Sequence, residues 1–309
     1  MATRTQTTDE HFPVQSIATL CSPTLQHVEL EVRLLGDIRV VAGASTVTGA
    51  DLPGPIGRHL LTRLVIDPFP VSRTRLVDDI WGGKAPRSVD SVLNATLSRL
   101  RTALDELDLD GRELISSSGG SVNFKRPKGT VVDVELAHHH IDFALRDLRT
   151  GDHREAARRA SIAYSISRRP LLTGIEREWL DIERDRMHHV ERRSLGLLAD
   201  VSFSSREFDM AVQLGRELVR IAPYDERAHR NLMNALRASG NPSGAAKVER
   251  DFTDRLNADL GVAPSPDFFV PLTPSSGANR SAERAAPRPS PSPHRRGRST
   301  TTSGRGSTP

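Results

Sequence analysis

The sequence lacks the residues on which several classes of protein depend. Its single cysteine, Cys21, excludes an internal disulfide framework and a zinc site made of several cysteines. No run of about 18 apolar residues occurs, so no membrane-spanning helix is expected. The opening segment MATRTQTTDE lacks the apolar core of a secretory signal. We therefore expect a cytoplasmic protein that does not enter a membrane.

Arrangements that indicate catalysis or a bound cofactor are missing as well. No Ser-His-Asp triad or pair of carboxylates emerges from the residue spacing, and no G-x-x-x-x-G-K-[ST] loop for nucleotides occurs. The run His138–His140 cannot hold one metal ion by itself, because three consecutive residues of a helix point in three directions. Trp179 is interpreted as an anchor for helix packing rather than a platform for a ligand. We expect no enzymatic activity, no metal and no cofactor.

The excess positive charge, +4 over 309 residues, is concentrated at the end of the chain. Residues 28–134 contain 14 basic and 14 acidic groups, whereas residues 273–309 contain seven Arg and one Glu. The latter segment has no Val, Ile, Leu, Met or aromatic residue, so it cannot bury enough apolar surface to offset the entropy of ordering. We predict a disordered basic C-terminal tail over residues 273–309 and a disordered N-terminal arm over residues 1–27.

Residues 28–134 have the order of elements that is typical of a winged helix-turn-helix domain of the α+β class. Residues 28–34 alternate between apolar and polar side chains, which indicates a half-buried strand. Two further short strands follow. Apolar spacing then predicts three helices, and a Gly-Gly turn predicts a hairpin. These segments are residues 38–41 and 46–48 for the strands, 60–65, 72–81 and 86–104 for the helices, and 114–124 for the hairpin.

Residues 135–272 have helical apolar spacing throughout, with a weak internal repeat. The segments REFDMA and GNPSGA begin 34 residues apart, at Arg206 and Gly240, and GDHREA at Gly151 has the same internal spacing. A period near 34 is that of tetratricopeptide (TPR) repeats. We therefore predict an all-α, TPR-like helical repeat domain. Paired helices should approach closely at the equivalent alanines of the three segments, Ala156, Ala211 and Ala245.

The predicted helix 86–104 combines an apolar face with a row of hydrogen-bonding side chains. If Val89 and the leucines at 93, 97, 100 and 104 are buried, the opposite side presents a row with no acidic member. Arg pairs with guanine edges or phosphate, Asn with adenine edges, and Ser with either, so the row favours major-groove binding. An ordinary amphipathic surface helix is the alternative from the helix alone. The row consists of Arg87, Ser91, Asn94, Ser98 and Arg101.

Charges near this helix also favour DNA. Residues 84–101 include four basic groups and one acid, Asp90, which we expect at the helix start, where the dipole favours a carboxylate. Groove binding requires positive charge where the helix meets phosphates. A solvated strand end is an equal alternative for the basic cluster after the hairpin. The candidates for backbone contacts are Lys84, Lys125, Arg126 and Lys128.

Several segments, in this order and spacing, resemble the SARP-type transcriptional regulators of actinobacteria. The segment RLVDDIW is similar to the family's RLVDALWG, LSRLRTAL to its VSRLRRAL, and DLGVAPSP to its ELGIDPSP. The resemblance covers residues 28–262. It implies an OmpR-type winged-helix DNA-binding domain joined to a bacterial transcriptional activation domain. The segments begin at Arg75, Leu97 and Asp259, and Leu34-Leu35-Gly36 and Ala222–Arg227 add to them.

The resemblance implies a sequence-specific regulator, usually an activator, that binds promoter repeats and contacts RNA polymerase. One winged helix buries a limited surface, so we expect a homodimer on repeated half-sites. Serines stand at 117, 118 and 121, where the family usually has an Arg near the tip of the hairpin. A TPR-type protein-interaction scaffold with a non-functional winged helix is the alternative. The family's recognition positions fall on Ser91, Asn94, Thr96, Ser98, Arg99 and Arg101.

Overall fold

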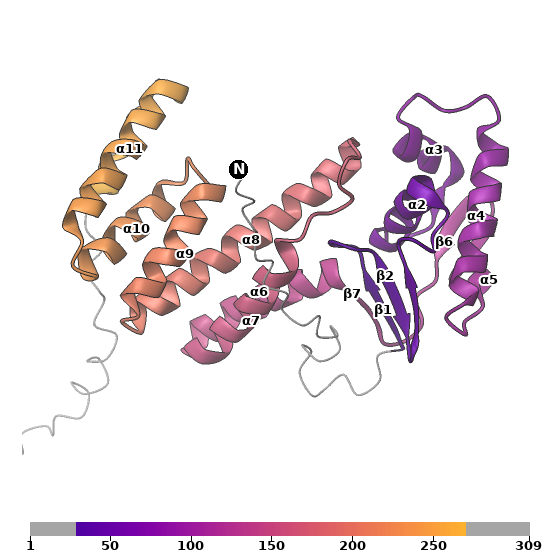
Figure 1. The fold of residues 1–309 in the computed structure, drawn as a ribbon, viewed down its shortest axis with the longest axis horizontal. Helices are drawn as coiled ribbons and strands as arrows, with labels where there is room; N and C mark the ends of the chain where they lie inside the picture. The colour runs from indigo at the N-terminus through magenta and orange to yellow at the C-terminus, as the bar shows by residue number, and fades with distance from the viewer. Residues whose placement is uncertain (1–28, 270–309) are drawn as a thin grey trace, which may run out of the picture. The chain divides into compact units, whose positions relative to one another are not determined.

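The structure, a computed structural model, describes residues 29–269 (Figure 1). The predicted arm (1–27) and tail (273–309) lie outside the described residues. The first domain begins with a four-stranded sheet of order β3-β2-β1-β7, antiparallel except for the parallel pair β1–β7. A second sheet has the order β4-β6-β5. The strands are β1 (Leu30–Arg33), β2 (Arg39–Ala42), β3 (Ser45–Thr48), β4 (Val71–Ser72), β5 (Ile115–Ser118), β6 (Ser121–Phe124) and β7 (Thr130–Val132).

Four helices and a hairpin follow the first three strands, and the sequence predicts all of them except the short fourth helix, which includes Leu114 of the predicted hairpin. The hairpin β5–β6, which we call the wing, turns at Gly119 and Gly120, both with positive φ (56° and 76°) as a type I′ turn requires. The short strand β4 pairs with β6 and so joins the wing to the helices. The helices of this domain are α2 (Gly54–Ile66), α3 (Arg73–Trp81), α4 (Val89–Asp105) and the short α5 (Gly111–Leu114).

Local sequence explains the ends of α3 and the turn before α4, whereas α2 begins at Gly54, six residues before the predicted start at residue 60. Ser72 caps α3 by accepting the Arg75 N–H at 3.2 Å, and Gly82 ends it with φ 56°. Helix α4 begins at Val89, three residues after the predicted start at Pro86. The Val89 N–H donates to the Pro86 carbonyl, so residues 86–88 form a turn before the helix. The proline suits this turn as well as it suits a helix start.

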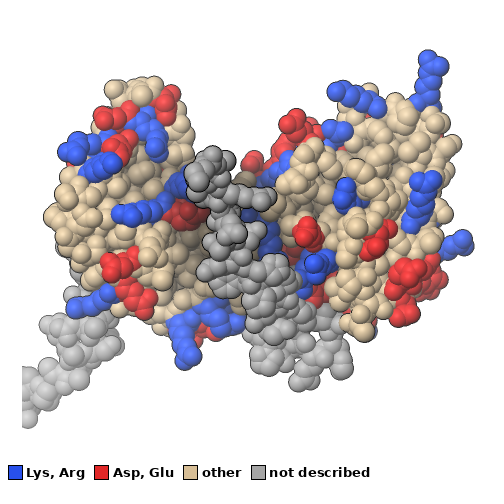
Figure 2. Space-filling model, in the orientation of Figure 1, with Lys and Arg blue, Asp and Glu red and all other residues tan. Residues whose placement is uncertain are grey.

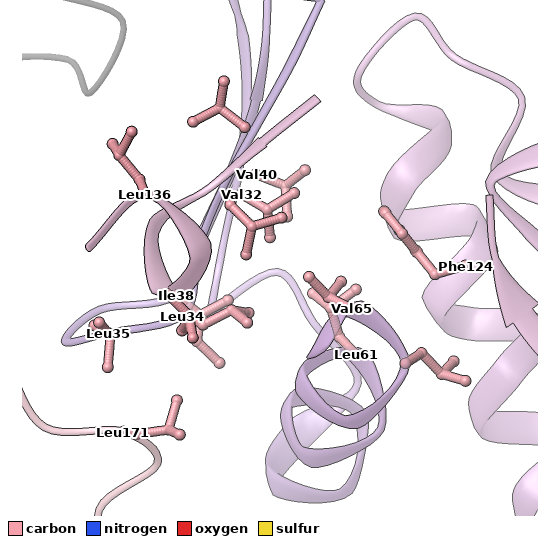
Figure 3. Packing of buried hydrophobic residues seen from close by; sticks show 14 of the residues in the cluster. Val32, Leu34, Leu35, Ile38, Val40, Leu61, Val65, Phe124, Leu136 and Leu171 are labelled. Atoms are coloured by element: carbon pink, nitrogen blue, oxygen red, sulfur yellow. The ribbon is translucent and has the colours of Figure 1, made fainter. Parts of the chain in front are cut away.

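The core of the first domain lies between the four-stranded sheet and α2. Val32 and Val40 of the sheet and Leu61 and Val65 of α2 are fully buried there (Figure 3). The predicted leucines of α4, at positions 93, 97, 100 and 104, are each at most 1% exposed, whereas Val89 is only half-buried. Burying each leucine contributes about 1.5–3 kcal/mol relative to exposure. This burial fixes which side of α4 faces solvent.

The second domain consists of antiparallel helix pairs, which confirms the predicted TPR-like repeat. The equivalent alanines of the three repeat segments are all buried, at most 2% exposed. Gly215 allows a close approach of α9 to α10, because a Cβ there would lie 3.2 Å from Leu232 Cδ1. The helices are α6 (Asp133–Thr150), α7 (His153–Ser167), α8 (Glu178–Ser204), α9 (Phe208–Ile221), α10 (Glu226–Ala238) and α11 (Pro242–Leu260), followed by the 3₁₀ helix η1 (Pro266–Phe269).

The two domains share a junction at β1 and β7. Helix α6 begins at Asp133, so the predicted boundary at residue 134 falls in its first turn. The buried Asp133 carboxylate accepts the N–H groups of Leu34 and Leu35 at 2.9–3.0 Å, which ties α6 to the end of β1. Leu35 and Leu171 face each other at the same junction (Figure 3). One hydrophobic cluster therefore continues from the winged helix into the first helices of the repeat.

Candidate nucleic-acid interface

The wing and α3 hold α4 so that one side of it is open to solvent. The Arg73 N–H at the start of α3 donates to the Gly120 carbonyl at the turn of the wing, at 3.0 Å. Beneath α4 its leucines are buried, and above them Ser91, Asn94 and Ser98 are exposed. These three positions recur at helical spacing, so they form one row. We call Ser91, Asn94 and Ser98 the exposed row.

Asn94 is held in one orientation by a residue that the sequence analysis did not single out. Its Oδ1 accepts a hydrogen bond of 2.5 Å from an Nη2 of Arg73. The bond orients the side-chain carbonyl oxygen of Asn94 toward Arg73, so the amide nitrogen points away from Arg73. The amide of Asn94 has two N–H donors, and its carbonyl oxygen has a second lone pair. Asn94 can therefore still donate to a base and accept from one. The contact joins residues 21 positions apart on two helices, so local sequence contains no signal of it.

Thr96 does not belong to the exposed surface. It is 8% exposed, and its hydroxyl donates to the Val92 carbonyl within α4 at 2.8 Å. The resemblance to the family placed Thr96 at a recognition position, whereas the helix spacing placed it toward the flank. The structure places its side chain toward the interior, so contact between Thr96 and a base is excluded in this arrangement. Arg99, which the spacing also placed on the flank, is exposed.

Arg101 joins α4 to the wing. Its Nε donates to the Ile115 carbonyl and its Nη2 to the Ser117 hydroxyl, both at 2.8 Å. Partial burial and the nearby Arg112 lower the pKa of Arg101 from its usual value, although a guanidinium remains charged. Two of its five N–H groups are used in these bonds, which leaves others for phosphate. Arg101 therefore orients the wing against α4 in addition to supplying charge.

The basic residues proposed for the DNA backbone fall into two groups. Lys84, Arg87, Lys125 and Lys128 are exposed, and the first two lie in the α3–α4 loop. Arg126 is half-buried and bonded internally, to Glu135 Oε1 at 2.6 Å and to the Val65 carbonyl at 2.5 Å. Its guanidinium crosslinks the strand end to α2 and α6. In this arrangement it is not directed at a phosphate.

The charges along α4 are unequal at its two ends. Figure 2 shows basic side chains projecting at the end of the domain where Figure 1 places the α3–α4 loop, and acidic ones gathered near α5. Asp90 lies in the first turn of α4, as predicted. Recognition helices of helix-turn-helix proteins use their N-terminal residues to contact bases. The basic end of α4 is therefore the end suited to DNA. The acidic side chains near the other end are Asp105, Glu106, Asp108, Asp110 and Glu113.

Neither a metal site nor a membrane-spanning helix is found within residues 29–269. In this range no group of three or more His, Cys, Asp or Glu side chains is arranged to hold a metal ion. Within the same range, no helix combines the length and apolar character needed to cross a bilayer. Trp179 donates its indole N–H to the Asp79 carbonyl at 3.2 Å, which agrees with its interpretation as a packing anchor.

Comparisons with known proteins agree with this architecture. Residues 132–269 match the family described as the bacterial transcriptional activator domain. The solved structure of Mycobacterium tuberculosis EmbR in complex with a low affinity phosphopeptide has a similar fold, with a TM-score of 0.69 at 21% sequence identity. The similarity covers 78% of this chain and 63% of the EmbR chain, and no curated protein sequence matches. The comparisons thus place a bacterial transcriptional activator domain at residues 132–269 and show an EmbR-like fold for the chain.

Proposed function

We propose that this protein is a sequence-specific DNA-binding transcription activator in which α4 enters the major groove with residues 91–98. The observation that supports this most is the exposed row of α4, which contains no acid and stands over four buried leucines. The activator domain at residues 132–269 supports the regulatory role. In this proposal, the helical domain contacts RNA polymerase, and two copies occupy repeated half-sites of a promoter.

Each exposed group has a distinct part in the proposal. Asn94, held by Arg73, reads an adenine edge through its amide, and Ser91 and Ser98 contact neighbouring bases. Arg87 and Lys84 in the α3–α4 loop bind phosphates on one side of the groove, with Arg99 beside the row and Lys125 and Lys128 as further candidates. The wing has no basic side chain between residues 115 and 124, so we assign it a supporting role rather than minor-groove contact.

The test is a quantitative comparison of duplexes and variants. Genomic fragments are first selected with the full-length chain, and affinity is then measured by fluorescence anisotropy across a salt series. Each neutralised phosphate should contribute about −0.9 to the slope of log affinity against log salt. Asn94→Ala should weaken the selected site by about 1–3 kcal/mol and leave random duplex unchanged.

Matched variants serve as controls. Asn257→Ala changes an exposed asparagine at the end of α11 and should have no effect on either duplex. Arg87→Ala should weaken the selected and the random duplex equally and reduce the salt slope by about one phosphate, whereas Arg250→Ala on α11 should not. If the folded full-length chain selects no fragment, the scaffold alternative replaces this proposal.

A further inference from the structure

The end of α3 is held by two residues of the helical domain. Arg177 donates from Nε and Nη2 to the Ile80 carbonyl, at 3.0 and 2.9 Å. Trp179, two residues later, donates its indole N–H to the Asp79 carbonyl at 3.2 Å. These bonds join residues 97 and 100 positions apart in the sequence. We call Arg177 and Trp179 the α3 clamp.

The clamp donates hydrogen bonds to backbone carbonyls at the C-terminal end of α3. The last four carbonyls of an α-helix have no donor within the helix, and Asp79 and Ile80 lie in the last turn of α3. A cation at this end also interacts favourably with the helix dipole. Arg177 supplies both the donors and the charge. Because charge-assisted hydrogen bonds are stronger than neutral ones, the contact to Ile80 should be the firmer of the two.

Aromatic packing fixes the second clamp residue to α2 as well as α3. The Trp179 ring stacks on His59 of α2, with centroids 5.3 Å apart and planes 22° apart. The guanidinium of Arg63, also of α2, lies 5.3 Å from the same ring. Arg63 is 4% exposed and pairs with Asp79 Oδ2 at 2.6 Å. The start of α8 is therefore joined to both helices that precede α4.

The clamped end of α3 is where the chain turns toward the DNA-reading helix. Gly82 and Gly83 follow α3 with φ of 56° and 78°, and residues 82–88 lead into α4. A Cβ at Gly82 would lie 3.4 Å from Arg177 Nε, so the clamp packs directly on the first loop residue. Two glycines impose little direction of their own on the backbone. The direction of the loop 82–88, which includes Lys84 and Arg87, is therefore set by the α3 clamp.

We propose that Arg177 and Trp179 are positioning residues for DNA recognition: through them the helical domain holds the end of α3, the loop 82–88 and the start of α4 in the arrangement that reads bases. This inference rests on the proposed function. It gives the activator domain a part in site recognition in addition to any contact with the transcription machinery. A winged helix without the clamp would still bind phosphates but would discriminate less between base sequences.

The first measurement needs no DNA. Amide hydrogen exchange of residues 82–92 is compared in the full chain and in the variants Trp179→Phe and Arg177→Ala. Trp179→Phe keeps a stacked ring and removes one neutral hydrogen bond, so exchange there should rise about fivefold. Arg177→Ala removes a charged donor pair, and exchange should rise about tenfold or more. Arg220→Ala, which removes a surface intrahelical pair on α9 with Glu217, should leave residues 82–92 unchanged.

The second measurement is affinity for a selected fragment and for random duplex. Each clamp variant should weaken binding of the selected fragment by about the factor by which it raises amide exchange. Binding of random duplex should change by less than about twofold. Unchanged exchange at residues 82–92 in Trp179→Phe overturns the inference, even if Arg177→Ala loosens the whole chain. If the wild-type chain binds no duplex, the proposed function fails, while the exchange experiment still decides whether the clamp orders the loop.

Discussion

His59 makes the free energy of unfolding depend on pH, by an amount that follows from its lowered pKa. The ring is 3% exposed and stacks on Trp179, and burial, with Arg177 nearby, lowers its pKa from 6.5 to about 4. Between these values the unfolded chain binds a proton that the folded chain does not. Folding stability is therefore complete above pH 6.5 and is lost as the pH falls toward 4. At about 1.36 kcal/mol per pKa unit, this histidine accounts for a loss of about 3 kcal/mol.

The assay is urea unfolding of the wild type and of His59→Phe at about pH 7 and about pH 4.5. Phenylalanine keeps a stacked ring on Trp179 and cannot bind a proton. Other groups, such as the buried His140, whose pKa is also lowered to about 4, titrate in both proteins and cancel in the difference. The variant should lose about 2–3 kcal/mol less on acidification than the wild type. An equal loss in both proteins would refute the buried, neutral state of His59.

Three further predictions concern the interface and its support. Arg73→Ala should release the Asn94 amide and reduce discrimination between selected and random duplex by about 1 kcal/mol, as measured by anisotropy. Asp133→Asn directs an NH₂ group at the amides of residues 34 and 35 and should lower the free energy of unfolding in urea by about 2–3 kcal/mol. Leu97→Ala should lower it by about 2–5 kcal/mol by leaving a cavity under the exposed row, whereas Leu260→Ala, at an exposed site, should change it little.

The elements that local pattern determines were predicted well. Period-two alternation located β1, but the strand is buried on both faces rather than half-buried as predicted, because Glu31 and Arg33 are buried as an ion pair. The hydroxyl of Ser72 located the start of α3, and leucine spacing identified the buried side of α4. The start of α4 was wrong by three residues, because a proline is equally compatible with the turn that precedes the helix. The parallel pairing of β7 with β1 joins segments about 100 residues apart, and short-range periodicity contains no information on such a pairing.

The candidate site was predictable only as a surface. Spacing identified which side chains of α4 face outward, but not which of them are already bonded. Arg101 and Arg126 have long side chains that reach backbone carbonyls 14 and 61 residues away. The contact of Arg73 with Asn94 and the α3 clamp are likewise tertiary. Charge and helical position are local properties, whereas the availability of a guanidinium depends on the fold.

In the proposed function the exposed row of α4 faces the duplex, and the single cysteine of the chain allows a direct measurement. In a Cys21→Ser background, an iron chelate is attached through Ser91→Cys on the exposed row or through Asn257→Cys on α11, and cleavage of a bound DNA fragment is mapped. We predict strong cleavage within the half-site from position 91 and none from position 257. Cleavage from position 257 with none from position 91 would contradict the account.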